Sequence, residues 1–204
     1  VSVNWWKGDG QYFLFLPSDA DMASLSLSFT ASADVTLDGE AVENGEAISL
    51  EAGKKYILAS NGVSYTLTVL KSENIPSLHI TTESGSMDAV HADKSHKEPA
   101  VITILADGDA VIEDSTLDYI KGRGNSTWSM KKKPYNIKFE KKTDLFEMGK
   151  AKKWSLLANY TDKSLLRNVV AYNLADNLGL EFVSKCVSVD LYVDGDYYGN
   201  YLLC

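Results

Sequence analysis

Short apolar–polar alternations separated by turn signals every 8 to 12 residues dominate the first 70 positions of this 204-residue chain. Period-2 alternation is typical of half-buried strands. Asp38-Gly39 and Asn61-Gly62 favour tight reversals between them. The pattern predicts a small all-β sandwich over residues 1–71. Within it, Asn4-Trp5-Trp6 is either a ligand-stacking platform or part of the apolar packing.

A polar stretch then predicts a boundary between two domains. It is Lys71-Ser72-Glu73-Asn74, just before Pro76. Beyond it, residues 78–82 and 101–105 read as strands that flank a polar loop over 83–99. Polar stretches of this kind between periodic segments are typical of linkers.

The later part of the chain combines strands with one long helix. The helix is predicted to begin at Thr161 or Asp162, residues that cap helices well, and to end at Gly179. Alternating apolar residues over 187–203 predict a hairpin around an Asp-Gly turn. Residues 75–204 are therefore predicted to form an α+β domain.

Composition excludes several classes of protein. The chain is 45% hydrophobic and 24% charged, which is typical of a globular protein. A net charge of −8 disfavours a general nucleic-acid-binding role, which usually needs a basic domain. No apolar run approaches the roughly 18 residues that a membrane span needs. The chain begins at Val1 without a recognisable signal peptide, as a processed or trimmed chain would.

Charge is distributed unevenly. Residues 121–153 contain 11 Lys and Arg but only three acidic residues, whereas the rest of the chain contains 9 basic and 25 acidic residues. One strongly basic segment in an acidic protein points to an anionic partner such as a phosphate, a nucleotide, an acidic peptide or an anionic polymer. Charge alone does not choose among these partners.

The most informative stretch is Ile120–Phe139. It opens with Gly122-Arg123-Gly124-Asn125-Ser126, where glycines let backbone N–H groups approach a ligand closely. It closes with Lys131-Lys132-Lys133, which precede a strand containing Tyr135. Lys133 lies two residues before Tyr135, so strand alternation would place both side chains on the same face. A cation beside a glycine-rich turn suits an anionic phosphate. The alternative is a tight hairpin loop followed by solvated lysines.

Cysteines and histidines give weak signals. Cys186 and Cys204 bracket the predicted hairpin, and a bulge at Gly199 would bring them opposite each other, so a cross-strand disulfide is one option. His91 and His96 lie in the polar loop without a third ligand, which favours loop histidines over a metal site.

Five blocks in order resemble the spore-coat protein H (CotH) kinase family. They are Lys121–Trp128, Lys132–Phe139, Lys150–Trp154, Leu156–Asn168 without Thr161, and Val189–Leu203 without Asp196 and Tyr197. The resemblance covers roughly residues 75–204. The first domain instead resembles the immunoglobulin-like or cadherin-like sandwiches attached to many secreted bacterial proteins.

The resemblance implies an atypical protein kinase with a remote kinase-like fold, of which these residues would be the amino-terminal half. Such proteins transfer phosphate from ATP, with Mg²⁺ or Mn²⁺, to serine in bacterial surface or coat proteins, which implies an extracellular or cell-surface location. By analogy with kinases, a lysine after the glycine segment would pair with the phosphates. The implied nucleotide-binding residues are Gly122, Arg123, Gly124, Asn125, Lys133, Lys138 as the second choice of lysine, Arg167 and Asn168.

Alternatives remain for several of these residues. Arg123, Asn125, Arg167 and Asn168 are equally explained by a structural hydrogen-bond network, and a pair between Asp162 and Arg167 within the helix explains Arg167.

The chain departs from the family in one respect. In the family, the catalytic and metal-binding aspartates follow the hairpin, but this sequence stops at Cys204. Turn chemistry explains Asp190, Asp194 and Asp196, so no catalytic or metal-binding residue is assigned. The piece is expected to be inactive alone, to expose apolar surface near the hairpin, and to dimerise through it. The alternative function is a non-catalytic scaffold for cell-surface or coat assembly.

Overall fold

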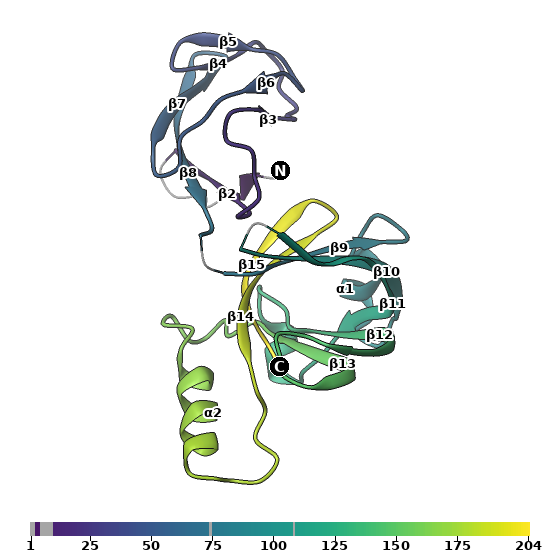
Figure 1. Ribbon diagram of the computed structural model, residues 1–204. Helices are drawn as coiled ribbons and strands as arrows, with labels where there is room; N and C mark the ends of the chain where they lie inside the picture. The colour runs from purple at the N-terminus through teal and green to yellow at the C-terminus, as the bar shows by residue number, and fades with distance from the viewer. Residues whose placement is uncertain (1–2, 5–9, 74, 108) are drawn as a thin grey trace. The chain divides into compact units, whose positions relative to one another are not determined.

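The computed structural model describes residues 3–4, 10–73, 75–107 and 109–204, which divide into two compact units (Figure 1). One unit comprises Val1–Ser77, Leu105–Asp109 and Gly195–Tyr197, and the other comprises Leu78–Ile104, Ala110–Asp194 and Tyr198–Cys204. The domain limits 1–71 and 75–204 stay a prediction, because two later segments cluster with the first unit. Trp5 and Trp6 lie outside the described residues, so the stacking platform also stays a prediction.

The first unit is all β, as the alternation predicted. A six-stranded sheet has the order β1-β2-β8-β7-β4-β5, and β3 pairs with β6 separately. β2 and β8 run parallel, whereas β7 is antiparallel to both β8 and β4. The strands are β1 (Val3–Asn4), β2 (Gln11–Leu16), β3 (Leu25–Ser26), β4 (Val35–Leu37), β5 (Glu40–Val42), β6 (Ala47–Ile48), β7 (Lys55–Ser60) and β8 (Val63–Lys71).

The alternation of side chains along each strand decides which residues form the core of this unit. Leu14 and Leu16 on β2 are buried together with Leu67 and Val69 on β8, two residues apart on each strand. Leu25, Leu27 and Phe29 alternate with serines, a pattern typical of a longer strand than the structure has. Regular pairing stops after Ser26, because the Leu27 carbonyl accepts from Gly45 N and Phe29 N donates to the Asn44 side chain.

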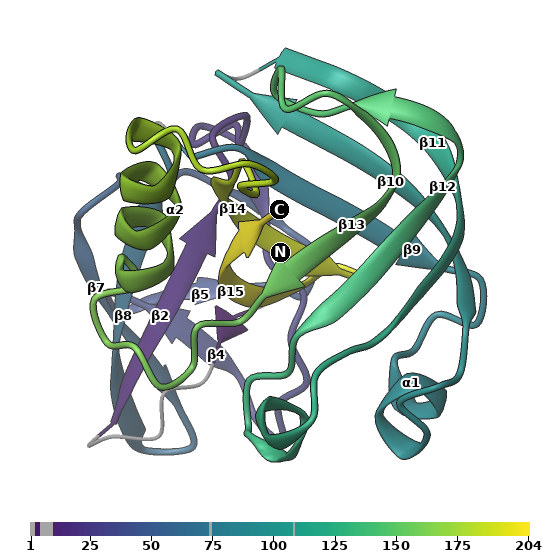
Figure 2. The same ribbon diagram turned by 90° about the horizontal axis from the view of Figure 1, so that it is seen from below.

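The second unit is a closed barrel of seven strands in the order β10-β11-β12-β13-β15-β14-β9 (Figures 1 and 2). Closure pairs the first strand of the unit, β9, with strands from later in the chain. The strands are β9 (Ser77–Thr82), β10 (Glu98–Ala106), β11 (Asp109–Gly122), β12 (Tyr135–Asp144), β13 (Lys150–Leu157), β14 (Val187–Val193) and β15 (Asp196–Leu203).

Alternating side chains fill the barrel. Ile137 faces Ile120 on β11 and Trp154 on β13, and all three are buried. Leu156 lies opposite Leu203, which is also buried. Interior positions of small barrels are filled by side chains in this way. The α+β prediction therefore underestimated the β content, because barrel closure depends on distant pairings that local periodicity does not report.

The predicted hairpin is confirmed. β14 and β15 are joined by Asp194 and Gly195, whose φ angles are 51° and 85°. Two positive φ angles are the signature of a type I′ hairpin turn, which Asp-Gly favours.

The predicted long helix is shorter and begins later. Helix α2 spans Arg167–Asn177, and a shorter helix, α1, spans Asp88–Ala92. The Asp162 carboxylate accepts from Ser164 N and Arg167 N, and Leu165 has a φ of 59°, so the segment before α2 is a tight turn instead of a helix. Among the described residues, neither helix is long and apolar enough to cross a membrane.

A group of strongly exposed apolar side chains lies on and around α2. Leu166, Val170, Leu174 and Leu178 recur every four residues and are 55–67% exposed. Phe182, beyond the helix, is 99% exposed. The hairpin was expected to carry the exposed apolar surface, but residues 189–193 of β14 and 201–203 of β15 are buried. The expectation placed the exposed apolar surface on the wrong element, because barrel closure covers the hairpin.

Candidate functional site

The glycine segment forms a tightly packed loop between β11 and β12. A Cβ atom on Gly122 would lie 2.5 Å from the ring of Trp128 and 2.8 Å from Cγ of Lys94. Gly124 has a φ of +83°, and a Cβ atom there would lie 2.1 Å from Oγ1 of Thr127. Both glycines are therefore required by packing, and Gly124 also by its left-handed backbone.

Hydrogen bonds to its backbone hold the same loop closed. Arg123 N donates to the Pro134 carbonyl at 3.1 Å, and Lys94 Nζ donates to the Gly124 carbonyl at 2.7 Å. Asn125 precedes a 3₁₀ helix over Ser126–Ser129, and its carbonyl accepts from Trp128 N at 3.1 Å. The segment is thus a compact hairpin loop with a short helix in it.

Lys133 closes the loop from its other side. Its Nζ donates to the Trp128 carbonyl at 2.8 Å and to the Met130 carbonyl at 3.4 Å. The ammonium group also lies 4.8 Å from the centre of a Trp128 ring, within range of a cation–π interaction. Lys133 therefore binds carbonyls of the loop between β11 and β12, next to the glycine segment in sequence.

Lys132, which the sequence prediction passed over, is the more perturbed lysine. Its Nζ donates to the Asn200 carbonyl and lies 4.5 Å from the centre of the Tyr201 ring. Burial lowers the pKa of Lys132 to about 8, and the nearby Asp190 carboxylate opposes this shift. A partly buried amine with a lowered pKa is a recognised mark of functional sites.

Strand alternation does not decide among the three consecutive lysines, so the choice of Lys133 stays a prediction. Because β12 begins only at Tyr135, after Pro134, the alternation of the strand does not extend back to Lys133 or Lys132. Which of the lysine side chains is buried depends on the loop and on β15, because Asn200 and Tyr201 on β15 contact Lys132.

Two buried tyrosines lie beside these lysines. Tyr135 shares a 2.8 Å hydrogen bond with Nε2 of His91, and the Tyr201 hydroxyl donates to the Lys133 carbonyl at 2.8 Å. Their rings lie 6.1 Å apart. Burial raises the pKa of both hydroxyls, so both stay neutral at physiological pH. Burial first, and then the charge of Lys133, lowers the pKa of His91.

Lys138 lies elsewhere on the barrel. It forms an ion pair with Asp118 on β11, and hydrogen bonding to that carboxylate raises its pKa. Its neighbours in the strand register are Tyr119 and Lys153. Since Ile137 and Phe139 on either side of it are buried, Lys138 points to the outside of the barrel. The structure therefore separates the second-choice lysine from the glycine segment.

Arg167 and Asn168 contact their own segment. Arg167 Nε lies 3.6 Å from an Asp162 carboxylate oxygen with its side chain 82% exposed, which is the pair weighed as the alternative. The Asn168 amide donates to the Asn159 side chain at 2.9 Å. Burial raises the pKa of Tyr172 on α2, and the charge of Arg123 in the glycine segment partly offsets this rise.

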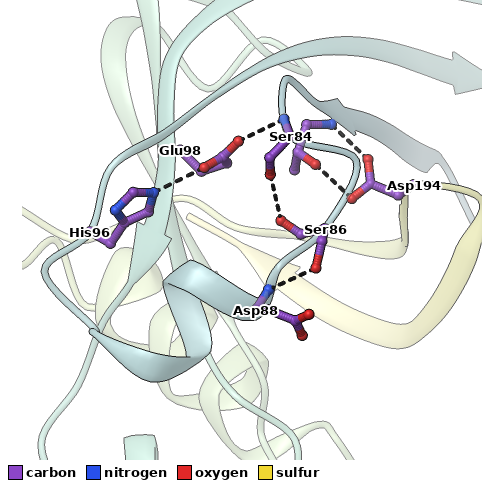
Figure 3. Close-up of polar contacts among 7 residues, drawn as sticks. Ser84, Ser86, Asp88, His96, Glu98 and Asp194 are labelled. Carbon is purple, nitrogen blue, oxygen red and sulfur yellow. Dashed lines mark hydrogen bonds and ion pairs between the residues drawn. The ribbon is translucent and has the colours of Figure 1, made fainter.

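A second polar network joins the loop after β9 to the hairpin turn (Figure 3). The carboxylate of Asp194 accepts from Thr82 N and Oγ1, both at 2.7 Å. Glu98 is buried, accepts from Ser84 N at 2.9 Å and lies 2.9 Å from Nε2 of His96. The contact with His96 is the main cause of the lowered pKa of Glu98. These groups brace the loop that follows β9.

The structure gives little support for metal or disulfide chemistry in the described part of the chain. There, no three His, Cys, Asp or Glu residues are grouped so that they could hold a metal ion. Cys186 and Cys204 are free thiols, so the disulfide option was wrong. Cys204 instead continues the barrel, because it exchanges both backbone hydrogen bonds with Ser155 on β13.

Fold and site together define a β-rich protein in which a glycine-rich loop, two lysines and two buried tyrosines meet at a barrel. The family model described as CotH kinase protein matches residues 120–204. The match includes the glycine loop, Lys132, Lys133, α2 and the hairpin, and confirms the resemblance over these residues. No curated protein matches the chain.

Proposed function

We propose that the chain is part of a secreted or surface-attached bacterial CotH-like protein that transfers phosphate from ATP to protein serine. The observation that carries this proposal is the family match over residues 120–204, which contains the lysines at the glycine loop. Residues 75–204 would be the amino-terminal half of an atypical kinase-like fold. The first unit would be an immunoglobulin-like domain attached to it.

The residues at the loop fit the phosphates of a nucleotide. Lys132, Lys133 and Arg123 supply cations, and lysine binds phosphate as a point charge. Gly122 and Gly124 let the loop backbone pack closely against the side chains of Trp128 and Thr127. ATP would supply the phosphoryl group. The resemblance also implies Mg²⁺ or Mn²⁺, but the described residues contain no cluster that fits a metal, so no residue of this chain is assigned to it.

Lys132 is our choice for the phosphate-binding lysine. Its amine is partly desolvated, donates to a carbonyl and faces an aromatic ring, with the Asp190 carboxylate nearby. An anionic phosphate nearby would favour the protonated amine and raise its pKa again. Lys133 would then hold the loop in shape through the Trp128 carbonyl, which is a positioning role.

Nucleotide binding and transfer in the complete protein test this assignment. We expect Lys132→Met to abolish the ATP-dependent rise in melting temperature in the presence of Mg²⁺ or Mn²⁺, and to abolish phosphate transfer to serine. Lys133→Met should weaken both. Lys131→Met removes the same charge from an exposed neighbour and should change neither. Unchanged binding by Lys132→Met would refute the choice of lysine, and no transfer by the unmodified protein would refute the kinase function.

The second candidate is a non-catalytic module for surface or coat assembly. The exposed apolar stripe Leu166, Val170, Leu174 and Leu178 favours it, since stripes of this kind mark interaction surfaces. Self-association would then use α2. Sedimentation of the complete protein with and without Leu174→Lys tests this. A concentration-dependent dimer that Leu174→Lys dissociates, together with no ATP response, would favour the scaffold function.

A further inference from the structure

Three neighbouring barrel strands, and the residue just before a fourth, place four lysines on the outer surface. Lys97 immediately precedes β10, Lys121 lies on β11, Lys138 on β12 and Lys153 on β13, and these strands are adjacent in the barrel. Lys138 lies directly opposite Lys153. Residues opposite each other in antiparallel strands share a face of the sheet. We call these four residues the lysine row.

Three of these lysines lie around the ring of Tyr119. The pairing of β11 with β12 shifts between Leu117 and Tyr119, and Tyr119 lies opposite the outward-facing Lys138. The Nζ atoms of Lys97, Lys121 and Lys138 lie 5.4, 5.7 and 6.0 Å from the centre of its ring. An aromatic face attracts cations at such distances. The ring therefore holds three like charges close together, and it is itself 92% covered.

Carboxylates compensate only part of this charge. Asp118 forms an ion pair with Lys138, and both side chains are about 30% exposed. The surrounding segment 121–153 has eight more basic than acidic residues. Crowded, partly exposed ammonium groups gain most from a ligand with several closely spaced negative charges, because each contact relieves repulsion and releases counterions.

The shape of this face favours a polyanion over a peptide. Since β11 and β12 have strand neighbours on both sides in the closed barrel, a peptide cannot add to them as a further strand. Next to Lys121 in the register lie Asn136 and Ser155, which hydrogen-bond to each other at 2.9 Å. These positions offer no exposed aromatic or aliphatic anchor of the kind that hot spots for protein partners use.

We propose that the lysine row binds a linear polymer that carries phosphate in its backbone. Successive phosphates contact Lys97, Lys121, Lys138 and Lys153 across the four strands. This site is separate from the glycine loop, and the inference does not depend on the kinase function. The protein would thereby be held on a phosphate-rich polymer.

Binding of long-chain polyphosphate to the complete protein tests the inference. We expect the affinity to fall with salt with a slope of about −3 in log K against log salt, at about −0.7 per charged contact. The variant Lys121→Gln/Lys138→Gln/Lys153→Gln should reduce that slope to about −1 and weaken binding at least tenfold at low salt. A matched control, Lys55→Gln/Lys163→Gln/Lys185→Gln, removes three exposed lysines elsewhere and should bind like the unmodified protein.

Other outcomes overturn the inference. Equal weakening by both triple variants would mean non-specific attraction. Polyglutamate of the same charge binding as tightly as polyphosphate would indicate an acidic protein partner, and binding to anionic vesicles alone would indicate a membrane surface. If the triple variant does not fold, Lys121→Gln/Lys153→Gln keeps the Lys138–Asp118 pair and should still weaken binding. The ATP response of the single variant Lys153→Gln should be unchanged, which separates this site from the nucleotide site.

Discussion

Replacing Gly124 with Ala should destabilise the barrel through two separable effects. The left-handed backbone, with a φ of +83°, costs an L-residue about 1–2 kcal/mol. The new Cβ atom would also lie 2.1 Å from Oγ1 of Thr127, and relieving such a clash costs about 1–3 kcal/mol. Because Thr is β-branched, it has few rotamers into which Oγ1 can turn. We therefore expect a total loss of about 2–5 kcal/mol.

Two further variants separate these effects. Gly149→Ala has the backbone effect alone, because its φ is +98° and no atom lies within 4 Å of the added Cβ, so it should cost about 1–2 kcal/mol. Thr127→Ala removes the clashing hydroxyl, and the exposed Thr127 contributes little by itself. Adding Thr127→Ala to Gly124→Ala should recover about 1–3 kcal/mol as coupling energy.

Amide hydrogen exchange is the appropriate assay, because the two units can unfold separately and a single global transition is not assured. Exchange of peptides from β11 and β12 reports the opening free energy of the strands that the loop joins. A Gly124→Ala protein no less stable than Gly149→Ala, or a double variant without recovery, would refute the argument. Either result would show that Thr127 moves aside at little cost.

Three further predictions concern the core and the titrating groups. Leu203→Ala should cost about 2–5 kcal/mol by urea unfolding because the side chain is fully buried, whereas Leu174→Ala, 57% exposed, should change stability by less than about 0.5 kcal/mol. The lowered pKa of Lys132 means that the unfolded state binds more protons above pH 8. Lys132 therefore adds to the free energy of unfolding as the pH rises from about 8 towards the ordinary lysine pKa range. Lys132→Met should remove that increase in the free energy of unfolding between pH 8 and 9. Lys133→Met should raise the pKa of His91 towards its ordinary value in an NMR titration, because a neighbouring positive charge is removed; an unchanged pKa would contradict this.

Local pattern predicted the parts of the fold that depend on neighbours in sequence. The Asp194-Gly195 hairpin is confirmed because its turn type follows from two residues that tolerate positive φ. The strand beginning at Tyr135 is confirmed because its apolar residues alternate. The start of α2 was predicted too early, because Asp162 caps a tight turn as readily as it caps a helix.

The candidate site could be found from sequence only in part. The glycine loop and its lysines stood out through composition, and the family match includes them. The choice between Lys132 and Lys133 could not be made, since it depends on Asn200 and Tyr201, which are remote in sequence. The role of Tyr135 and its bond to His91 also depended on packing between separate elements.

The sequence by itself determined the all-β character of the first unit, the hairpin, the basic segment and the resemblance of residues 120–204 to the CotH family. These depend on alternation, turn residues and charge, which act over a few positions. Only the tertiary structure decided that the second unit closes into a barrel, that the apolar stripe of α2 stays exposed, and that four lysines line up across its outer face. Closure and strand register are set by pairing between distant segments, and a shift of one residue would turn each of these lysines to the other face.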